Sequence, residues 1–570
     1  MIAEEEDGID KELTLAMISN EAQTSAREMD CSPLANLNSA WERFYKQRWP
    51  ENIKKKNVFS SMEADHFVEV DVIDWQQLYW ERHLQECLDA ATEQALLPAF
   101  DCDVAELEIP GNIMSSIGHF GSDNCPCSKL LFHCHKFGCY IRTIRLQSVL
   151  CNEELCELLR ASKLQGLVLR RITSRRHVDG VCKLINQHRE NLVSVDLVYC
   201  KLSPLDVDMI CSSFYGKETN IHDIQHFSIK TSNIFGNKSS SIRSGLLSFL
   251  SSGRSLRSVC FADSHLRQKS AEAIFEVLID SSHGLLDLEI SGNELNGWLS
   301  RIGSKYASFS QFSASHASLL SLRLLNLRAN NLHENDVEDL LHVLVNMPNL
   351  RSLDLSANPI GDDGVRRLIP FFVKALEETS NVAEIWLENC ELSGAGVAEL
   401  CRSLAMTKGQ LETFSVADND LGSSVAAELA KALDELRIKH LNIEDIGLGP
   451  LGFQELERKL PKDMALTCIN ISKNRGGIQA VHFICHLVSL ARSLVLINAG
   501  SNLLPPEALS ILPDALKKSE GKLKELDLTG NPSLFPAINE SIMPLFQLKE
   551  NSIIKLPLFS QTTNPYDDDP

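Results

Sequence analysis

Two stretches of this chain share one spacing of leucine and asparagine. Residues 322–332 read LRLLNLRANNL and residues 350–360 read LRSLDLSANPI, and both fit L-x-x-L-x-L-x-x-N-x-L at an offset of about 28 residues. The spacing predicts a short strand with inward leucines, a turn whose backbone groups bond to Asn330 or Asn358, and a returning helix. One such unit cannot bury its own apolar face, so the units must stack on one another.

The same spacing continues through most of the chain after its first quarter. Strands are expected to start at Ile141, Leu164, Leu192, Ile224, Leu256, Leu285, Leu322, Leu350, Val382, Leu411, Ile438, Leu466, Leu494 and Leu523. Helical patterns lie between these starts, for example over 337–347 and 424–436. The asparagine position is filled by another residue in some units: Cys200, Ser232, Ser264, Cys390 and Ile446. A serine-rich interval at 296–318 is too long for one unit, and we expect it to protrude.

The repeat length, with room for a full return helix, resembles that of ribonuclease-inhibitor-type leucine-rich repeats. This resemblance covers about three quarters of the chain. It implies an α/β solenoid with a curved parallel sheet inside and helices outside, preceded here by an N-terminal α-helical cap or F-box-like segment.

The sequence predicts five segments. These are a disordered acidic lead at 1–12, a helical F-box-like or capping domain at 13–97, an irregular Cys/His-rich connector at 98–140, about fourteen repeats at 141–545, and a C-terminal cap and tail at 546–570.

Two tryptophan-rich stretches before the repeats have helical periodicity. LNSAWERFYKQRWP at 37–50 and DWQQLYWERHL at 74–84 place apolar residues at steps of three and four. They resemble the F-box-like region of elongin A and related cullin-adaptor receptors. The resemblance implies an adaptor-binding region made of Trp41, Phe44, Tyr45, Trp75, Leu78 and Tyr79.

The upstream sequence departs from this family. TLAMIS at 14–19 has Ser19 where an elongin-binding box has cysteine, and the Leu-Pro that opens an F-box is missing. The alternative is that the helices only cover the exposed end of the first repeat, because terminal repeats of a solenoid need a cap.

Composition narrows the class of protein. The chain has 570 residues, of which 44% are hydrophobic and 23% charged, as in folded soluble proteins. A formal net charge of -21 disfavours nucleic acid and suits a protein partner with a basic surface. We expect neither a signal peptide nor a membrane span, and the 17 cysteines read as free thiols. These features predict an intracellular protein of the nucleus or cytoplasm.

One segment, CPCSKLLFHCHKFGC, is dense in cysteine and histidine. It contains Cys125, Cys127, His133, Cys134, His135 and Cys139. Such side chains can hold tetrahedral zinc, but the spacing is not the paired C-x-x-C of a strong zinc signal. A loop with free thiols is the simpler interpretation. We therefore predict no metal and no cofactor, and the missing nucleotide-binding and hydrolase motifs predict that the protein is not an enzyme.

Alternate residues of each strand should face the open, concave side of the sheet. In the middle repeats these are Asp287, Glu289, Asn326, Arg328, Asp354, Glu384, Trp386 and Glu388. A tryptophan between two glutamates fits a binding site for a basic protein. The alternative is that Trp386 lies flat on neighbouring repeats.

Three functions fit the sequence. The first is a substrate receptor of a cullin-type ubiquitin ligase, joined through a Skp-type or elongin-type adaptor and holding its target on the concave face. The second is a chromatin or signalling adaptor for a basic partner, since Tonsoku-type proteins carry similar repeats. The third is a small-GTPase regulator, since Ran GTPase-activating proteins do too. They carry a long acidic tail, whereas this sequence ends with only Asp567–Asp569.

Overall fold

The computed structural model describes residues 33–50, 73–95, 130–216, 221–233, 244–281, 284–302, 317–377, 382–407, 409–519, 521–538 and 553–556. The acidic lead, the 14–19 segment, Cys125, Cys127 and Asp567–Asp569 lie outside these residues. The chain divides into two compact units, residues 1–224 and 225–570.

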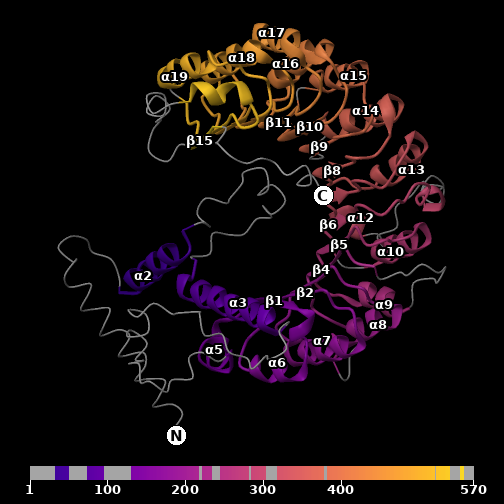
Figure 1. Cartoon of the computed structure of the whole chain (residues 1–570). Helices are drawn as coiled ribbons and strands as arrows, with labels where there is room; N and C mark the ends of the chain where they lie inside the picture. The colour runs from indigo at the N-terminus through magenta and orange to yellow at the C-terminus, as the bar shows by residue number, and fades with distance from the viewer. Residues whose placement is uncertain are drawn as a thin grey trace, which may run out of the picture. The chain divides into compact units, whose positions relative to one another are not determined.

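The first unit begins with helices and continues with three strand–helix repeats (Figure 1). Its elements are α2 (Pro33–Arg48), α3 (Trp75–Ala95), α5 (Leu130–Phe137), β1 (Thr143–Gln147), α6 (Glu153–Leu158), β2 (Gly166–Arg170), α7 (Arg175–His188), β3 (Ser194–Val198) and α8 (Pro204–Ser213). Strands β1, β2 and β3 pair in parallel. Helix α5 lies in the segment predicted to be an irregular connector.

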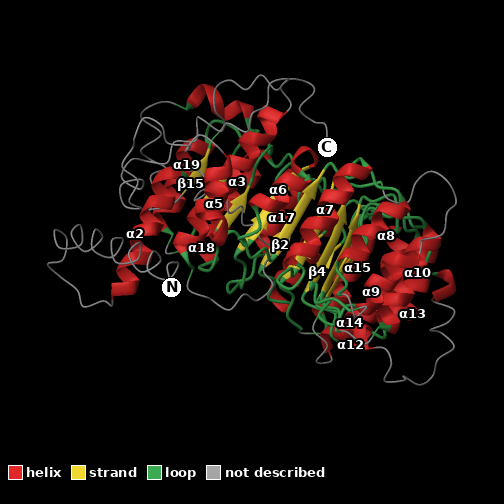
Figure 2. Cartoon of the chain, turned by 90° about the horizontal axis from the view of Figure 1, so that it is seen from below, coloured by secondary structure: helices red, strands yellow, loops and turns green. Residues whose placement is uncertain are grey.

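The second unit continues the same alternation, with its strands side by side and the helices on one face of the sheet (Figure 2). Its strands are β4 (His226–Lys230), β5 (Ser258–Ala262), β6 (Asp287–Glu289), β7 (Leu324–Asn326), β8 (Ser352–Asp354), β9 (Glu384–Trp386), β10 (Thr413–Ser415), β11 (His440–Asn442), β12 (Cys468–Asn470), β13 (Leu496–Asn498), β14 (Glu525–Asp527) and β15 (Ile553–Lys555). Its helices are α9 (Ser244–Ser252), α10 (Gln268–Asp280), α12 (Ala317–Ser321), α13 (Glu334–Leu344), α14 (Gly361–Glu377), α15 (Gly394–Ala405), α16 (Ala426–Glu435), α17 (Gly449–Lys459), α18 (Gly477–Leu490) and α19 (Ala508–Lys518).

The strand register stacks equivalent residues of successive repeats. Leu325, Leu353, Ile385 and Phe414 are paired neighbours on β7 to β10, and all are buried. The predicted leucine-rich-repeat solenoid is therefore confirmed. Each of the fourteen expected starts lies two residues before a strand, and a further strand, β15, lies within the predicted C-terminal cap and tail.

The asparagine of the repeat bonds to the backbone where the chain leaves the strand. Asn358 Nδ2 donates to the carbonyls of Leu327 (2.9 Å) and Leu355 (2.8 Å), and its Oδ1 accepts from the backbone N–H of Asn330 (2.8 Å) and Leu332 (3.0 Å). One buried side chain thus joins two repeats. Cys390 replaces part of this function, because its thiol donates to the Leu355 carbonyl at 3.3 Å.

The serine-rich interval does not protrude at its start. Trp298, Leu299 and Ile302 are buried, and the Trp298 ring meets Phe275 edge-on at 5.4 Å. The expectation was wrong for these residues because their apolar side chains extend the core of the repeat. Residues 303–316 lie outside the described part of the chain. Among the described helices, none has both the length and the apolar character required to cross a bilayer.

Candidate functional site

Helices α2 and α3 are held together by aromatic rings. Trp41 of α2 packs against Tyr79 and Trp80 of α3, with ring centroids 5.3 and 5.6 Å apart. Trp80 in turn stacks on Phe137 of α5 at 3.9 Å. Trp41, Tyr79 and Trp80 are all buried, so these rings form the core of the N-terminal helices.

The six residues of the adaptor resemblance fall into two groups. Trp41 and Tyr79 are buried in this core. The other four are only partly buried: Phe44, Tyr45, Trp75 and Leu78. Tyr45 and Trp75 contact each other across the helix pair at 5.5 Å. The resemblance thus combines residues that hold the helices together with residues that keep some surface for a partner.

Helix α3 also covers the edge of strand β1. Glu81 Oε2 accepts from the backbone N–H of Arg142 (2.7 Å) and Thr143 (2.9 Å). Gln85 both accepts from the Arg145 N–H (2.8 Å) and donates to the Arg145 carbonyl (3.0 Å). Four helical residues advance about 6 Å, close to the roughly 6.6 Å of two strand residues, so residues four apart on α3 follow the strand.

Two further side chains extend this row. Gln77 donates to the Tyr140 carbonyl at 3.2 Å, and Asp89 pairs with the Arg145 guanidinium at 2.6 Å. The bonding row of α3 consists of Gln77, Glu81, Gln85 and Asp89. Within it, Glu81 and Gln85 satisfy backbone groups at the edge of β1 that a terminal strand would otherwise leave open. None of its members belongs to the six residues of the adaptor resemblance.

A group of titratable side chains is buried between α3 and α5. His83 Nε2 lies 3.0 Å from His133 Nδ1 and 3.6 Å from the Cys87 sulfur. Arg48 NH2 lies 3.0 Å from His83 Nδ1. Burial lowers the pKa of His83 well below its ordinary value, and Arg48 and His133 lower it further. Burial also raises the pKa of Cys134 to about 12.

The cysteine and histidine residues named from the sequence do not form one site in the described residues. His133 and Cys134 are buried, whereas His135 and Cys139 are exposed. Instead, His133 meets His83 and Cys87 of α3, about 50 residues earlier in the chain. Sequence reasoning missed His83 and Cys87. Their four-residue spacing on a helix was the available signal, since it places both on one face.

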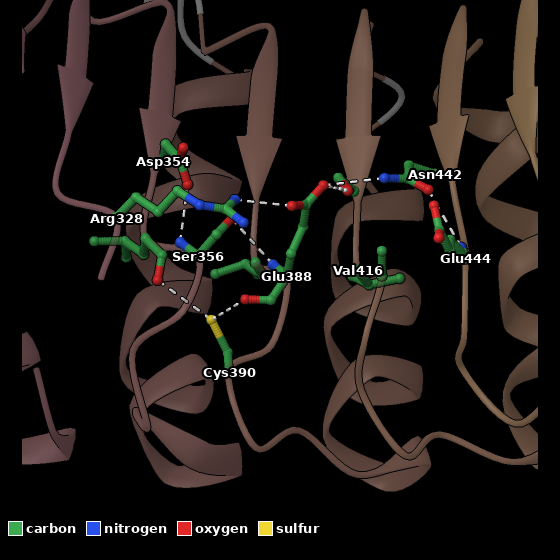
Figure 3. Close-up of polar contacts among 12 residues, drawn as sticks. Arg328, Asp354, Ser356, Glu388, Cys390, Val416, Asn442 and Glu444 are labelled. Carbon is green, nitrogen blue, oxygen red and sulfur yellow. Dashed lines mark hydrogen bonds and ion pairs between the residues drawn. The ribbon is translucent and has the colours of Figure 1, made fainter. Parts of the chain in front are cut away.

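Glu388 is the centre of a polar network on the concave face of the second unit (Figure 3). Its carboxylate pairs with Arg328 NH1 at 2.8 Å and accepts from Ser415 Oγ at 2.6 Å and Asn442 Nδ2 at 3.0 Å. Ser415 and Asn442 belong to β10 and β11, and Arg328 lies two residues after the end of β7, so one glutamate links several repeats. Glu388 is therefore already occupied by protein groups.

The other acidic residues named from the sequence differ in their surroundings. Asp287 is buried, and Glu289 accepts from the Cys260 thiol and the Ser291 hydroxyl at 3.2 and 2.9 Å. Removal from water raises the pKa of Asp354, although Ser356 and Arg328 lower it. Asn326, which is not acidic, accepts through Oδ1 from the backbone N–H of Arg328, two residues further along the chain, at 2.9 Å.

Glu384 and Trp386 remain partly exposed on strand β9. Strand β9 places Trp386 between Asp354 and Ser415 of the flanking strands, with its ring partly exposed. Glu384 is also partly exposed and makes no ion pair with another described residue. Glu388 and Glu289 thus bond to other groups of the protein, whereas Glu384 beside Trp386 makes no ion pair among the described residues.

Comparison with known proteins identifies the repeats. No family model matches the chain. Ribonuclease inhibitor of Sus scrofa is 27% identical over 270 residues, which cover 47% of this chain and 56% of that protein. This chain is thus similar in its repeats to ribonuclease inhibitor. The chain spans about half the length of the ribonuclease inhibitors it matches.

Two further matches are with a Tonsoku-like protein and with a chain of a yeast complex. Tonsoku-like protein of Mus musculus is 28% identical over 252 residues, which cover 42% of this chain and 18% of that protein. A chain of the yeast Rad7–Elc1 complex covers 90% of this chain and 97% of its own length, at 11% identity and a TM-score of 0.34. That score is too low to support an inference about partners. Ribonuclease-inhibitor-like repeats are generally non-catalytic surfaces for protein binding.

Proposed function

We propose that this repeat protein is a substrate receptor that joins a target on its concave face to a cullin adaptor held by its N-terminal helices. The observation that supports the proposal is that α2 and α3 use one set of side chains to contact the repeats and leave another set partly exposed. The bonding row of α3 fixes the helices to β1, while Phe44, Tyr45, Trp75 and Leu78 keep exposed surface. Capping the repeats and binding an adaptor therefore use different side chains.

Direct binding of purified adaptors to the full chain tests this proposal. The probes are a Skp-type adaptor and an elongin B–elongin C pair, each measured by calorimetry. Phe44→Asp should weaken the bound adaptor at least about tenfold, the loss expected for a partly buried aromatic anchor. Gln47→Asp adds the same charge to an exposed position of α2 and should have little effect.

Two results would reject the adaptor assignment. One is that neither adaptor binds the full chain while its tryptophan fluorescence shows the N-terminal helices to be folded. The other is an equal loss of binding in Phe44→Asp and Gln47→Asp. Trp41 and Tyr79 are unsuitable for this test because their removal would open the core that joins α2 to α3.

A second candidate function is an adaptor for a basic partner without a ligase link. Glu384 beside the partly exposed Trp386 favours it, because an aromatic ring next to a carboxylate without an ion pair among the described residues suits a lysine- or arginine-rich segment. To test this function, we compare how strongly a basic partner binds to Glu384→Lys and to Asp434→Lys. The second variant makes an equal charge change at an exposed position of α16.

A further inference from the structure

We propose that His83, Cys87 and His133 are ligands of a structural zinc ion that joins α3 to α5. One possible ligand atom of each residue, a ring nitrogen of the histidines or the sulfur of the cysteine, lies within 4.8 Å of the other two. The three side chains are 0–1% exposed. This set differs from the short-spaced cysteine and histidine segment that the sequence offers, since two of its members come from another helix.

The distances match the edges of a zinc tetrahedron. Zinc–nitrogen bonds of about 2.0–2.1 Å and zinc–sulfur bonds of about 2.3 Å place two nitrogens about 3.3 Å apart and a nitrogen and a sulfur about 3.6 Å apart. The corresponding distances are 3.0 Å between the two histidine nitrogens and 3.6 Å between His83 Nε2 and the Cys87 sulfur. Small side-chain adjustments therefore suffice to enclose an ion.

The elements supply these ligands from two rigid positions. His83 and Cys87 are four residues apart on α3 and so share one face of that helix. His133 comes from α5 and is also buried. Imidazole nitrogens and a thiolate sulfur are the donors that zinc prefers in proteins.

Without metal, the same atoms form a hydrogen-bonded chain. Arg48 NH2 donates to His83 Nδ1, which leaves the proton of His83 on Nε2, facing His133 Nδ1. Zinc on Nε2 requires that proton to sit on Nδ1, and the Cys87 thiol to release its proton to solvent. Arg48 then turns to its other partners, the Tyr79 hydroxyl at 2.9 Å and Glu86 at 3.4 Å.

Metal titration of the reduced, chelator-treated full chain tests the site. Cobalt(II) is the probe, because tetrahedral cobalt with thiolate ligands has strong visible bands and thiolate charge-transfer absorption. We expect one tightly bound cobalt per chain, displaced by one equivalent of zinc. Cys87→Ser and His133→Gln should abolish this spectrum.

Matched variants separate this site from its alternatives. Cys139→Ser and His135→Gln change exposed residues of the same segment and should leave the titration unchanged. Arg48→Gln provides an acceptor for the Nδ1 proton and should retain the full metal content. A wild-type chain that takes up no stoichiometric metal would overturn the proposal without any variant. Retention of the spectrum in Cys87→Ser, or its loss in Cys125→Ser/Cys127→Ser alone, would also overturn it.

Discussion

At the scale of a single residue, the surroundings of Asp354 on the concave face change its pKa. Its carboxyl is partly removed from water, which raises its pKa, so the folded chain holds this proton more tightly than the unfolded chain does. The stability that this proton supplies is complete below the ordinary pKa of an aspartate. It is lost as the pH rises through the raised pKa of the folded state.

Asp354→Asn should therefore stabilise the protein at neutral pH by about 1 kcal/mol and have no effect near pH 3, where both residues are uncharged. The asparagine can still accept the Ser356 backbone N–H, which bonds to Asp354 Oδ1 at 2.8 Å. Thermal unfolding midpoints at several pH values measure the difference. Asp434→Asn, at an exposed position, is the control. If Asp354→Asn raised the unfolding midpoint equally at every pH, burial of the charge would not be the cause of the stabilisation.

Among the secondary-structure elements, helix α3 bonds to the edge of β1, where a further strand would otherwise pair. Glu81→Ala leaves the N–H groups of Arg142 and Thr143 without their acceptor, which should cost about 1–3 kcal/mol of local stability. Hydrogen exchange of the β1 amides should accelerate accordingly. Glu93→Ala changes an exposed residue of the same helix and should leave β1 unchanged. Equal exchange in the two variants would mean that solvent replaces Glu81 without cost.

At the scale of the whole molecule, the net charge of -21 does not translate directly into a binding surface. In the second unit several carboxylates are paired with cations of other repeats: Glu388 with Arg328, Glu444 with Lys473, Glu412 with Arg351 and Lys439, and Glu525 with Lys555. Glu384 makes no such pair with a described residue, so it should dominate recognition of a basic partner on this face.

Binding of poly-lysine to the full chain measures this effect. Glu384→Lys should weaken binding several-fold more than Asp434→Lys does, and both differences should shrink as salt rises, because exposed charges are screened over about 10 Å at 0.1 M. Equal losses in the two variants would show that overall charge, rather than the concave face, drives the association.

Sequence periodicity by itself determined the solenoid. Leucines at fixed spacing have one way to become buried in a stack of like units, and Asn330 and Asn358 bond to the backbone as that spacing predicts. The N-terminal helices also followed from the three- and four-residue steps of their aromatic residues.

Only the tertiary structure decided which side chains meet across elements. Local spacing does not show that Glu388 is bonded from other strands, that residues four apart on α3 bond to β1, or that His133 lies against His83 and Cys87 rather than beside Cys139. These contacts join residues 27 to 62 positions apart. Their distances depend on how whole helices and strands pack, which no local repeat of the sequence encodes.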